Sequence, residues 1–144
     1  MSMTNYDRDF HAWSREQAEL LRERQFAALD VEHLVEELES MGSRERRELT
    51  SRLKVLLSHL LTWQCQPERR SPSWNATIKE QRLSLEDLLD DNPSLRPTLP
   101  EQVTKAYRLA RLLAVKETNL PESAFPAACP YAPEQVTNPD FYPG

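Results

Sequence analysis

Glycine is scarce in this chain: only two of the 144 residues are glycine, against eleven prolines. Tight β-hairpin turns need residues with positive φ, which glycine adopts most readily, so the shortage argues against a hairpin-rich β architecture. No apolar run approaches the roughly 18 residues that a membrane-spanning helix needs. These two absences favour a helical protein that has no membrane segment.

Positive charge is also in short supply. Eighteen lysines and arginines stand against 23 aspartates and glutamates, which gives a formal net charge of -5. Because nucleic-acid-binding domains are usually basic, this balance argues against a nucleic-acid partner, although a local basic patch is still possible.

The two cysteines, Cys65 and Cys129, have no metal-ligand spacing and are expected to be reduced thiols. The first ten residues lack the apolar segment of a secretory signal, which predicts a cytoplasmic protein.

Apolar residues recur at helical spacing in five stretches of the chain. The pattern predicts helices over residues 5–25, 31–41, 43–66, 72–91 and 100–118. Asp30 and Ser71 are the expected N-caps of the second and fourth helices, and Gly42 is expected to end the second in a left-handed conformation. The expected inner face of that second helix consists of Val31, Leu34, Val35 and Leu38.

Beyond Asn119 the composition changes. Residues 120–144 hold six prolines and four aromatic side chains, Phe125, Tyr131, Phe141 and Tyr142. Proline prevents long helices, whereas a fully disordered tail would carry fewer aromatics. We therefore expect an all-α fold, with a bundle of about five helices over residues 1–119 and an extended tail over residues 120–144 that packs on the bundle.

Short segments along the whole chain match a family pattern. They are Asp9-Phe10 with Trp13, 17–22, Leu29-Asp30, 36–42, 51–53, 59–61, Trp63-Gln64, 66–71, Trp74 with Ile78, Gln81-Arg82, 92–95, Glu117-Thr118, Phe125-Pro126 and 129–131. On these segments the chain resembles a family of small helical bacterial proteins, abundant in cyanobacteria, that is called domain of unknown function twenty-nine. The resemblance implies an all-α fold and brings no activity with it, and no cofactor is expected.

Arg52 and His59 form the first candidate site. They are seven residues apart, which is two helical turns, so they share one face of the third predicted helix. The pair looks similar to the metal-independent ribonucleases of the HEPN class, in which a histidine would act as general acid or base and an arginine would stabilise the phosphate. Those enzymes usually place a polar residue after the arginine, where this chain has Leu53. The alternative is a structural histidine that bonds to Glu36 or Glu37.

Glu36 and Glu37 are the second candidate, because all-α nucleotide pyrophosphatases hold Mg²⁺ with clustered helix carboxylates. The third position of the expected Glu-Glu-x-x-Glu pattern is Ser40, and the best second acidic pair is Glu86-Asp87. The competing interpretation is a solvated acidic face.

The Asp30-x-x-His33 element is another possible metal site. Di-iron bundles use two Glu-x-x-His elements and two further glutamates, and no second such element occurs in the sequence. The sequence therefore predicts no metal site there.

The turn around Arg69, Arg70 and Trp74, together with Arg82, is the candidate site for a ligand or phosphate. The arginine guanidinium forms bidentate hydrogen bonds with carboxylate and phosphate groups, and an exposed tryptophan can stack on a nucleic-acid base. The structural alternative is that Trp74 packs inward while the arginines cap the carboxyl end of the third helix or pair with glutamates.

Of all these functions, the sequence favours a non-catalytic interaction or scaffold protein, which could form a homodimer, over the ribonuclease and the nucleotide hydrolase.

Overall fold

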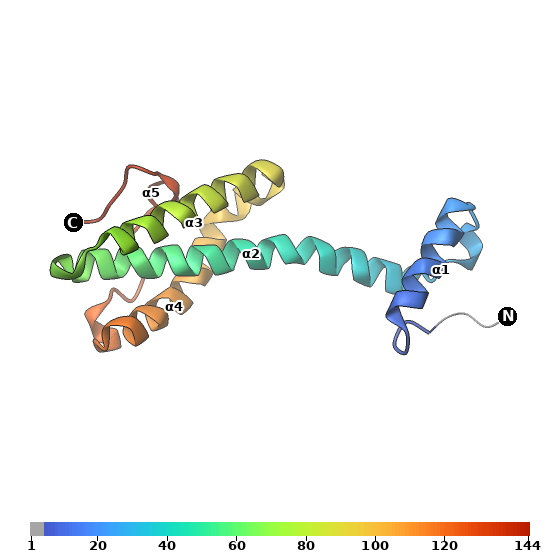
Figure 1. Cartoon of the computed structure of the whole chain (residues 1–144), viewed down its shortest axis with the longest axis horizontal. Helices are drawn as coiled ribbons and strands as arrows, with labels where there is room; N and C mark the ends of the chain where they lie inside the picture. The colour runs from blue at the N-terminus through green and yellow to red at the C-terminus, as the bar shows by residue number, and fades with distance from the viewer. Residues whose placement is uncertain (1–4) are drawn as a thin grey trace. The chain divides into compact units, whose positions relative to one another are not determined.

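The computed structural model describes residues 5–144, and every regular element in that range is helical. Packing divides the chain into a first unit that ends at Ser43 and a second unit, Arg44–Gly144, and each is described by itself. The α-helices, labelled in Figure 1, are α1 (Phe10–Arg22), α2 (Val31–Cys65), α3 (Pro72–Asp91), α4 (Leu99–Thr118) and α5 (Pro133–Thr137). Short 3₁₀ turns occur as η1 (Phe26–Ala28), η2 (Pro67–Arg69), η3 (Pro93–Thr98) and η4 (Glu122–Ala124). The predicted all-α class is confirmed.

Helix α2 replaces two predicted helices, so the predicted break at Gly42 is wrong. Gly42 lies inside the helix, and among the described residues Gly144 is the one glycine with positive φ. A glycine inside a helix costs only about 1 kcal/mol relative to alanine. Strong helix formers such as Met41 and Arg44 on either side offset that cost, so the helix continues.

Helix α1 is shorter than the predicted range 5–25. It begins at Phe10 because the carboxylate of Asp9 accepts a hydrogen bond from the backbone N–H of Ala12 at 3.0 Å, which makes Asp9 the N-cap. A predicted helix that starts at residue 5 has Thr4 or Asn5 as its expected N-cap, which is wrong for Asn5, and Thr4 lies outside the described residues. Asn5 instead closes a turn, in which its carbonyl accepts from the N–H of Asp9.

The ends of α3 and α4 follow the sequence signals closely. The hydroxyl of Ser71 accepts a hydrogen bond from the N–H of Trp74 at 3.2 Å, and Pro72 occupies the first helical position, as predicted. Helix α4 ends where Asn119 adopts the left-handed conformation, with φ of 59°.

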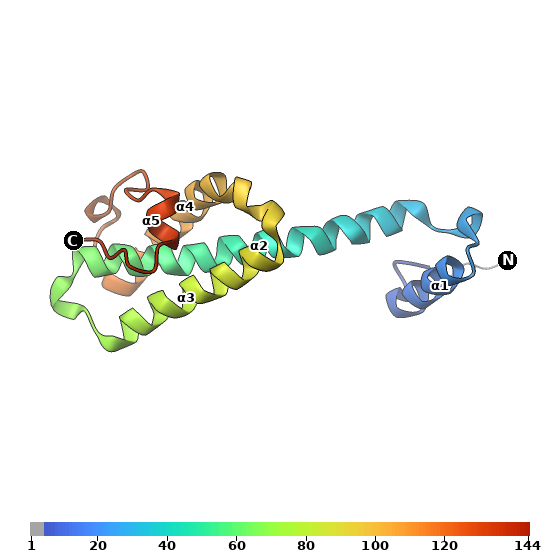
Figure 2. The ribbon, with the colours of Figure 1, turned by 90° about the horizontal axis from the view of Figure 1, so that it is seen from above.

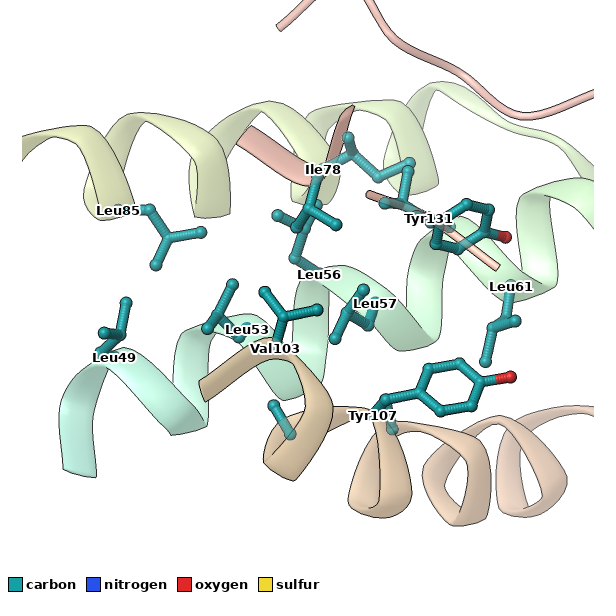
Figure 3. Packing of buried hydrophobic residues seen from close by; sticks show 14 of the residues in the cluster. Leu49, Leu53, Leu56, Leu57, Leu61, Ile78, Leu85, Val103, Tyr107 and Tyr131 are labelled. Carbon is teal, nitrogen blue, oxygen red and sulfur yellow. The ribbon is translucent and has the colours of Figure 1, made fainter. Parts of the chain in front are cut away.

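The core of the second unit lies between α2, α3 and α4. Figures 1 and 2 show α3 and α4 on opposite sides of the second half of α2. Figure 3 shows the α2 leucines pointing toward Ile78 and Leu85 of α3 and toward Val103 and Tyr107 of α4. The fully buried leucines of α2 are Leu49, Leu53, Leu56, Leu57, Leu60 and Leu61. They form one wide apolar stripe, as expected from apolar residues that recur at helical spacing over residues 43–66.

The proline-rich stretch after α4 packs side chains on this core and contains the short helical segments η4 and α5. Phe125 and Tyr131 are buried, and the Tyr131 hydroxyl donates to the side-chain oxygen of Gln64 at 2.7 Å. Burial raises the pKa of Tyr107 to about 12, and its hydroxyl donates to the carbonyl of Pro126. The division of the chain at residue 119 stays a prediction.

Candidate functional site

Asp30 is the centre of a polar cluster in the first unit. Its carboxylate oxygen Oδ2 accepts a hydrogen bond from Nε1 of Trp13 at 3.0 Å and lies 2.7 Å from Nδ1 of His33. Its backbone N–H donates to the side-chain oxygen of Gln17 at 2.8 Å. Trp13 and Gln17 are one turn apart on α1, and Asp30 directly precedes α2. Two side chains of α1 therefore hold the residue that precedes α2: Trp13 bonds to its carboxylate and Gln17 bonds to its backbone N–H.

Aromatic rings cover this cluster. The ring of Tyr6 stacks on His33 with 4.1 Å between centroids and meets Trp13 edge-on at 4.8 Å. The hydroxyl of Tyr6 donates to the carboxylate of Glu37, and this bond raises the pKa of Tyr6 to about 12. Because the hydroxyl stays protonated up to that pH, the contact between Tyr6 and α2 persists across the neutral range.

His33 and Asp30 perturb each other's protonation. The hydrogen bond to Asp30 raises the pKa of His33, and the hydrogen bond from His33 lowers the pKa of Asp30. A carboxylate only accepts, so Nδ1 of His33 carries the proton and Nε2 is left for other chemistry. The ring borders an open cavity of about 510 Å³, which is lined by Asn5, Tyr6, Leu29, Asp30, Val31, Glu32 and His33. Among the described residues, the lining supplies the carboxylates of Asp30 and Glu32 and the imidazole of His33, which are groups that can bind a proton or a cation.

We expect the His33–Asp30 pair to stabilise the first unit most at mildly acidic pH. The raised pKa of His33 gives stability that is complete below the unfolded value of about 6.5 and is lost as pH rises through the folded pKa. The lowered pKa of Asp30 gives stability that is complete above about 3.8 and is lost as pH falls through the folded pKa. The optimum therefore lies between these two values.

An NMR titration of the His33 ring protons tests this expectation. In the wild-type chain the midpoint should lie above the ordinary value for histidine, and in Asp30→Asn it should return toward that value. A midpoint that does not change between the two proteins would show that Asp30 does not hold the imidazolium.

A second feature of the first unit is an exposed apolar face on α2, here called the acidic–apolar face. Its apolar members are Val31 (59% exposed), Val35 (47%), Leu38 (65%) and Met41 (55%). Its exposed carboxylates are Glu32, Glu36 and Glu39. The sequence predicts that Val31, Val35 and Leu38 form the inner face of a helix, but in the structure they are exposed while Leu34 is half-buried. The reason is that Trp13 of α1 and Tyr6 before it pack on the adjacent side, where Trp13 contacts Asp30 and His33 and Tyr6 contacts His33 and Glu37.

Comparison with known proteins places the chain in a family. The family described as Domain of unknown function DUF29 matches residues 5–142. The chain belongs to this family. No curated protein and no solved structure matches the chain. The DUF29 description carries no activity, so function has to be argued from the residues.

Arg52 and His59 each bond within the second unit. Nδ1 of His59 donates to the carbonyl of Val55 at 2.9 Å, on the same helix. The Arg52 guanidinium lies 3.5 Å from the carboxylate of Glu48, and its Nη1 donates to the side-chain oxygen of Gln81 at 3.4 Å. Both side chains are half-buried. A ribonuclease role for this pair stays a prediction.

Of the two candidate magnesium carboxylates, Glu37 bonds to Tyr6 and Glu36 is exposed. Glu86 and Asp87 are exposed on α3, in the second unit. Among residues 5–144 no group of three or more histidines, cysteines and carboxylates could hold a metal ion.

The three arginines that were predicted to bind a ligand differ in their contacts and exposure. Nε of Arg70 donates to the carbonyl of Trp63 at 2.7 Å, near the end of α2, and its Nη2 donates to the carbonyl of Gly144 at 3.1 Å. Arg82 is buried against the tail, whereas Arg69 is exposed. Trp74 is half-buried, and its backbone N–H bonds to Ser71. A role for these residues in binding phosphate stays a prediction.

Sequence reasoning missed the cluster that joins Tyr6, Trp13 and Gln17 to Asp30. One signal could have found it. Gln17 follows Trp13 by one turn on the apolar side of α1, and a polar side chain in such a stripe needs a hydrogen-bond partner. The nearest polar group in sequence that begins the next helix is Asp30.

In the described part of the chain, residues 5–144, no helix combines the length and the apolar character that crossing a bilayer requires.

Proposed function

We propose that this DUF29 chain is a non-catalytic interaction protein that binds another polypeptide through the acidic–apolar face of α2. The observation that carries the proposal is the exposure of Val31, Val35, Leu38 and Met41 along one face of a single helix. Contiguous exposed apolar side chains with polar residues around them are typical of protein-binding surfaces.

The helical register of α2 supports this proposal. Val31, Val35 and Leu38 each precede a fully buried leucine of the same helix by 18 residues, which is five complete turns. The buried leucines are Leu49, Leu53 and Leu56. The same apolar pattern therefore occurs twice in α2, once covered by α3 and α4 and once exposed. A pattern that forms a core in one place is suited to packing against a helix in the other.

The small core of the first unit supports the proposal as well. Among its described residues only Trp13 and Gln17 are buried. A unit of this size rarely gains enough stability from its own core, so covering more apolar surface on binding would stabilise it. The carboxylates of the face favour a partner surface that carries lysine or arginine.

Site-specific photocross-linking in cells tests the proposal. A photoreactive benzophenone amino acid replaces Leu38, and in a matched control it replaces Leu83, which is 64% exposed on α3. We expect a discrete protein adduct at position 38 and none at position 83, because only the first belongs to an apolar face. An adduct with a second copy of the chain counts as a protein adduct. If neither position 38 nor position 83 gives a protein adduct, the proposal is overturned.

A further inference from the structure

Helix α4 carries a second exposed apolar surface, and its charge is positive. Leu109 is 49% exposed and Leu112 is 48% exposed. Their exposed cationic neighbours, at helical spacing, are Lys105, Arg108 and Lys116. This set of five residues is called the basic–apolar face. A groove of about 690 Å³ runs beside it, lined by Lys105, Arg108, Leu109, Arg111, Leu112, Glu122 and Ala127.

The two exposed helix faces are complementary. Each places aliphatic side chains along a helix, one with Glu32, Glu36 and Glu39, the other with Lys105 and Arg108. We propose that the acidic–apolar face of one molecule docks on the basic–apolar face of a second copy of this chain. This inference rests on the proposed function and names its partner.

Charge decides which faces pair. Two acidic–apolar faces laid together would bring six exposed glutamates into one interface, and two basic–apolar faces would bring together six cations. Like charges across an interface disfavour the complex, whereas opposite charges favour it and speed association. Mixed pairing buries the apolar side chains of both faces and sets the three glutamates of one face against the three cations of the other.

Mixed pairing has two measurable consequences. Because each copy carries both faces, association gives a closed pair if the two contacts are reciprocal and longer assemblies if they are not. Salt screens attraction between opposite charges, so the association should weaken as ionic strength rises. Pairing of two acidic faces would strengthen with salt instead.

Complementation between two variants of the full chain tests the inference. Leu38→Asp damages only the acidic–apolar face, and Leu109→Asp damages only the basic–apolar face. Each variant alone should associate at least about tenfold more weakly than the wild type, because an unpaired carboxylate would be buried at the contact. An equimolar mixture should form a one-to-one complex, since each variant supplies the face that the other has lost. Sedimentation velocity measures all three samples.

Two controls separate binding from folding. Leu83→Asp changes an equally exposed leucine outside both faces and should associate like the wild type. Circular dichroism should show the same helix content in all variants, because the substituted side chains are exposed. A second form of the test uses the charge-reversal variants Arg108→Glu and Glu36→Arg. Each variant alone should associate more weakly than the wild type, and their mixture should recover association.

The outcomes are distinct. A wild-type chain that stays monomeric up to millimolar concentration overturns the inference, as does association that strengthens with salt or a mixture that does not recover. If Leu38 in cells cross-links only to a different protein, the second-copy inference falls and the proposed function stands. If position 38 yields no adduct and the wild type is monomeric, both fall.

Discussion

Replacing Leu57 with alanine should lower the free energy of unfolding of the second unit by about 3 kcal/mol. Leu57 is fully buried at the middle of the core, where its side chain points between α3 and α4 (Figure 3). Removing three side-chain carbons, a methine and two methyl groups, loses their transfer free energy and leaves a cavity that well-packed neighbours fill only in part. Urea unfolding followed by far-ultraviolet circular dichroism measures the loss.

The matched control is Leu83→Ala. Leu83 is mostly exposed, so the same chemical change there should alter the free energy of unfolding by no more than about 0.5 kcal/mol. Equal losses for Leu57→Ala and Leu83→Ala would contradict the placement of the core between α2, α3 and α4.

Arg82 should be the polar residue whose loss destabilises the second unit most. It is buried on α3, its Nε donates to the carbonyl of Val136 at 2.9 Å, and its Nη2 donates to the carbonyl of Gln135 at 3.3 Å. The guanidinium also lies 5.5 Å from the ring centre of Tyr142. Burial lowers the pKa of Arg82. Arg82→Ala should therefore cost about 3 kcal/mol, because two carbonyls lose a charged donor and a cavity opens.

Hydrogen exchange gives this prediction a local readout. In Arg82→Ala the amides of α5 should exchange faster than in the wild type, since the side chain that holds α5 is gone. Lys79→Ala, at an exposed position three residues earlier on α3, should leave both the exchange and the stability unchanged. If the two variants behave alike, Arg82 does not anchor the tail.

Helix positions could be predicted from the sequence where a local signal marks them. The Ser71-Pro72 start of α3 and the Asn119 end of α4 both have side-chain or backbone chemistry that acts within one turn. Gly42 misled the prediction because its penalty is small compared with the gain from continuing a helix through strong formers. Periodicity also cannot show whether an apolar face is covered, since that depends on which other element packs there.

The candidate site was predictable only in part. The position of Asp30 before an apolar run predicts that it is an N-cap. Its carboxylate does accept a hydrogen bond from the backbone N–H of His33, with a long N–O distance of 3.5 Å. Its bonds to Trp13 and to the His33 ring depend on how α1 returns past α2, which no spacing encodes. For Arg70 the capping alternative matches a hydrogen bond in the structure, the one to the carbonyl of Trp63.

The doubled apolar pattern of α2 bears on how tightly a partner could be held. Amides near Leu56 lie in a packed core and should open only with the whole unit, whereas amides near Leu38 lie on an exposed turn and should open locally. Part of any binding energy would then go into holding residues 31–43 helical. The strength of the complex would thus respond to the intrinsic helix preference of this stretch as well as to the contacts it makes, so an alanine at an exposed position such as Ser40 could tighten binding without touching the partner.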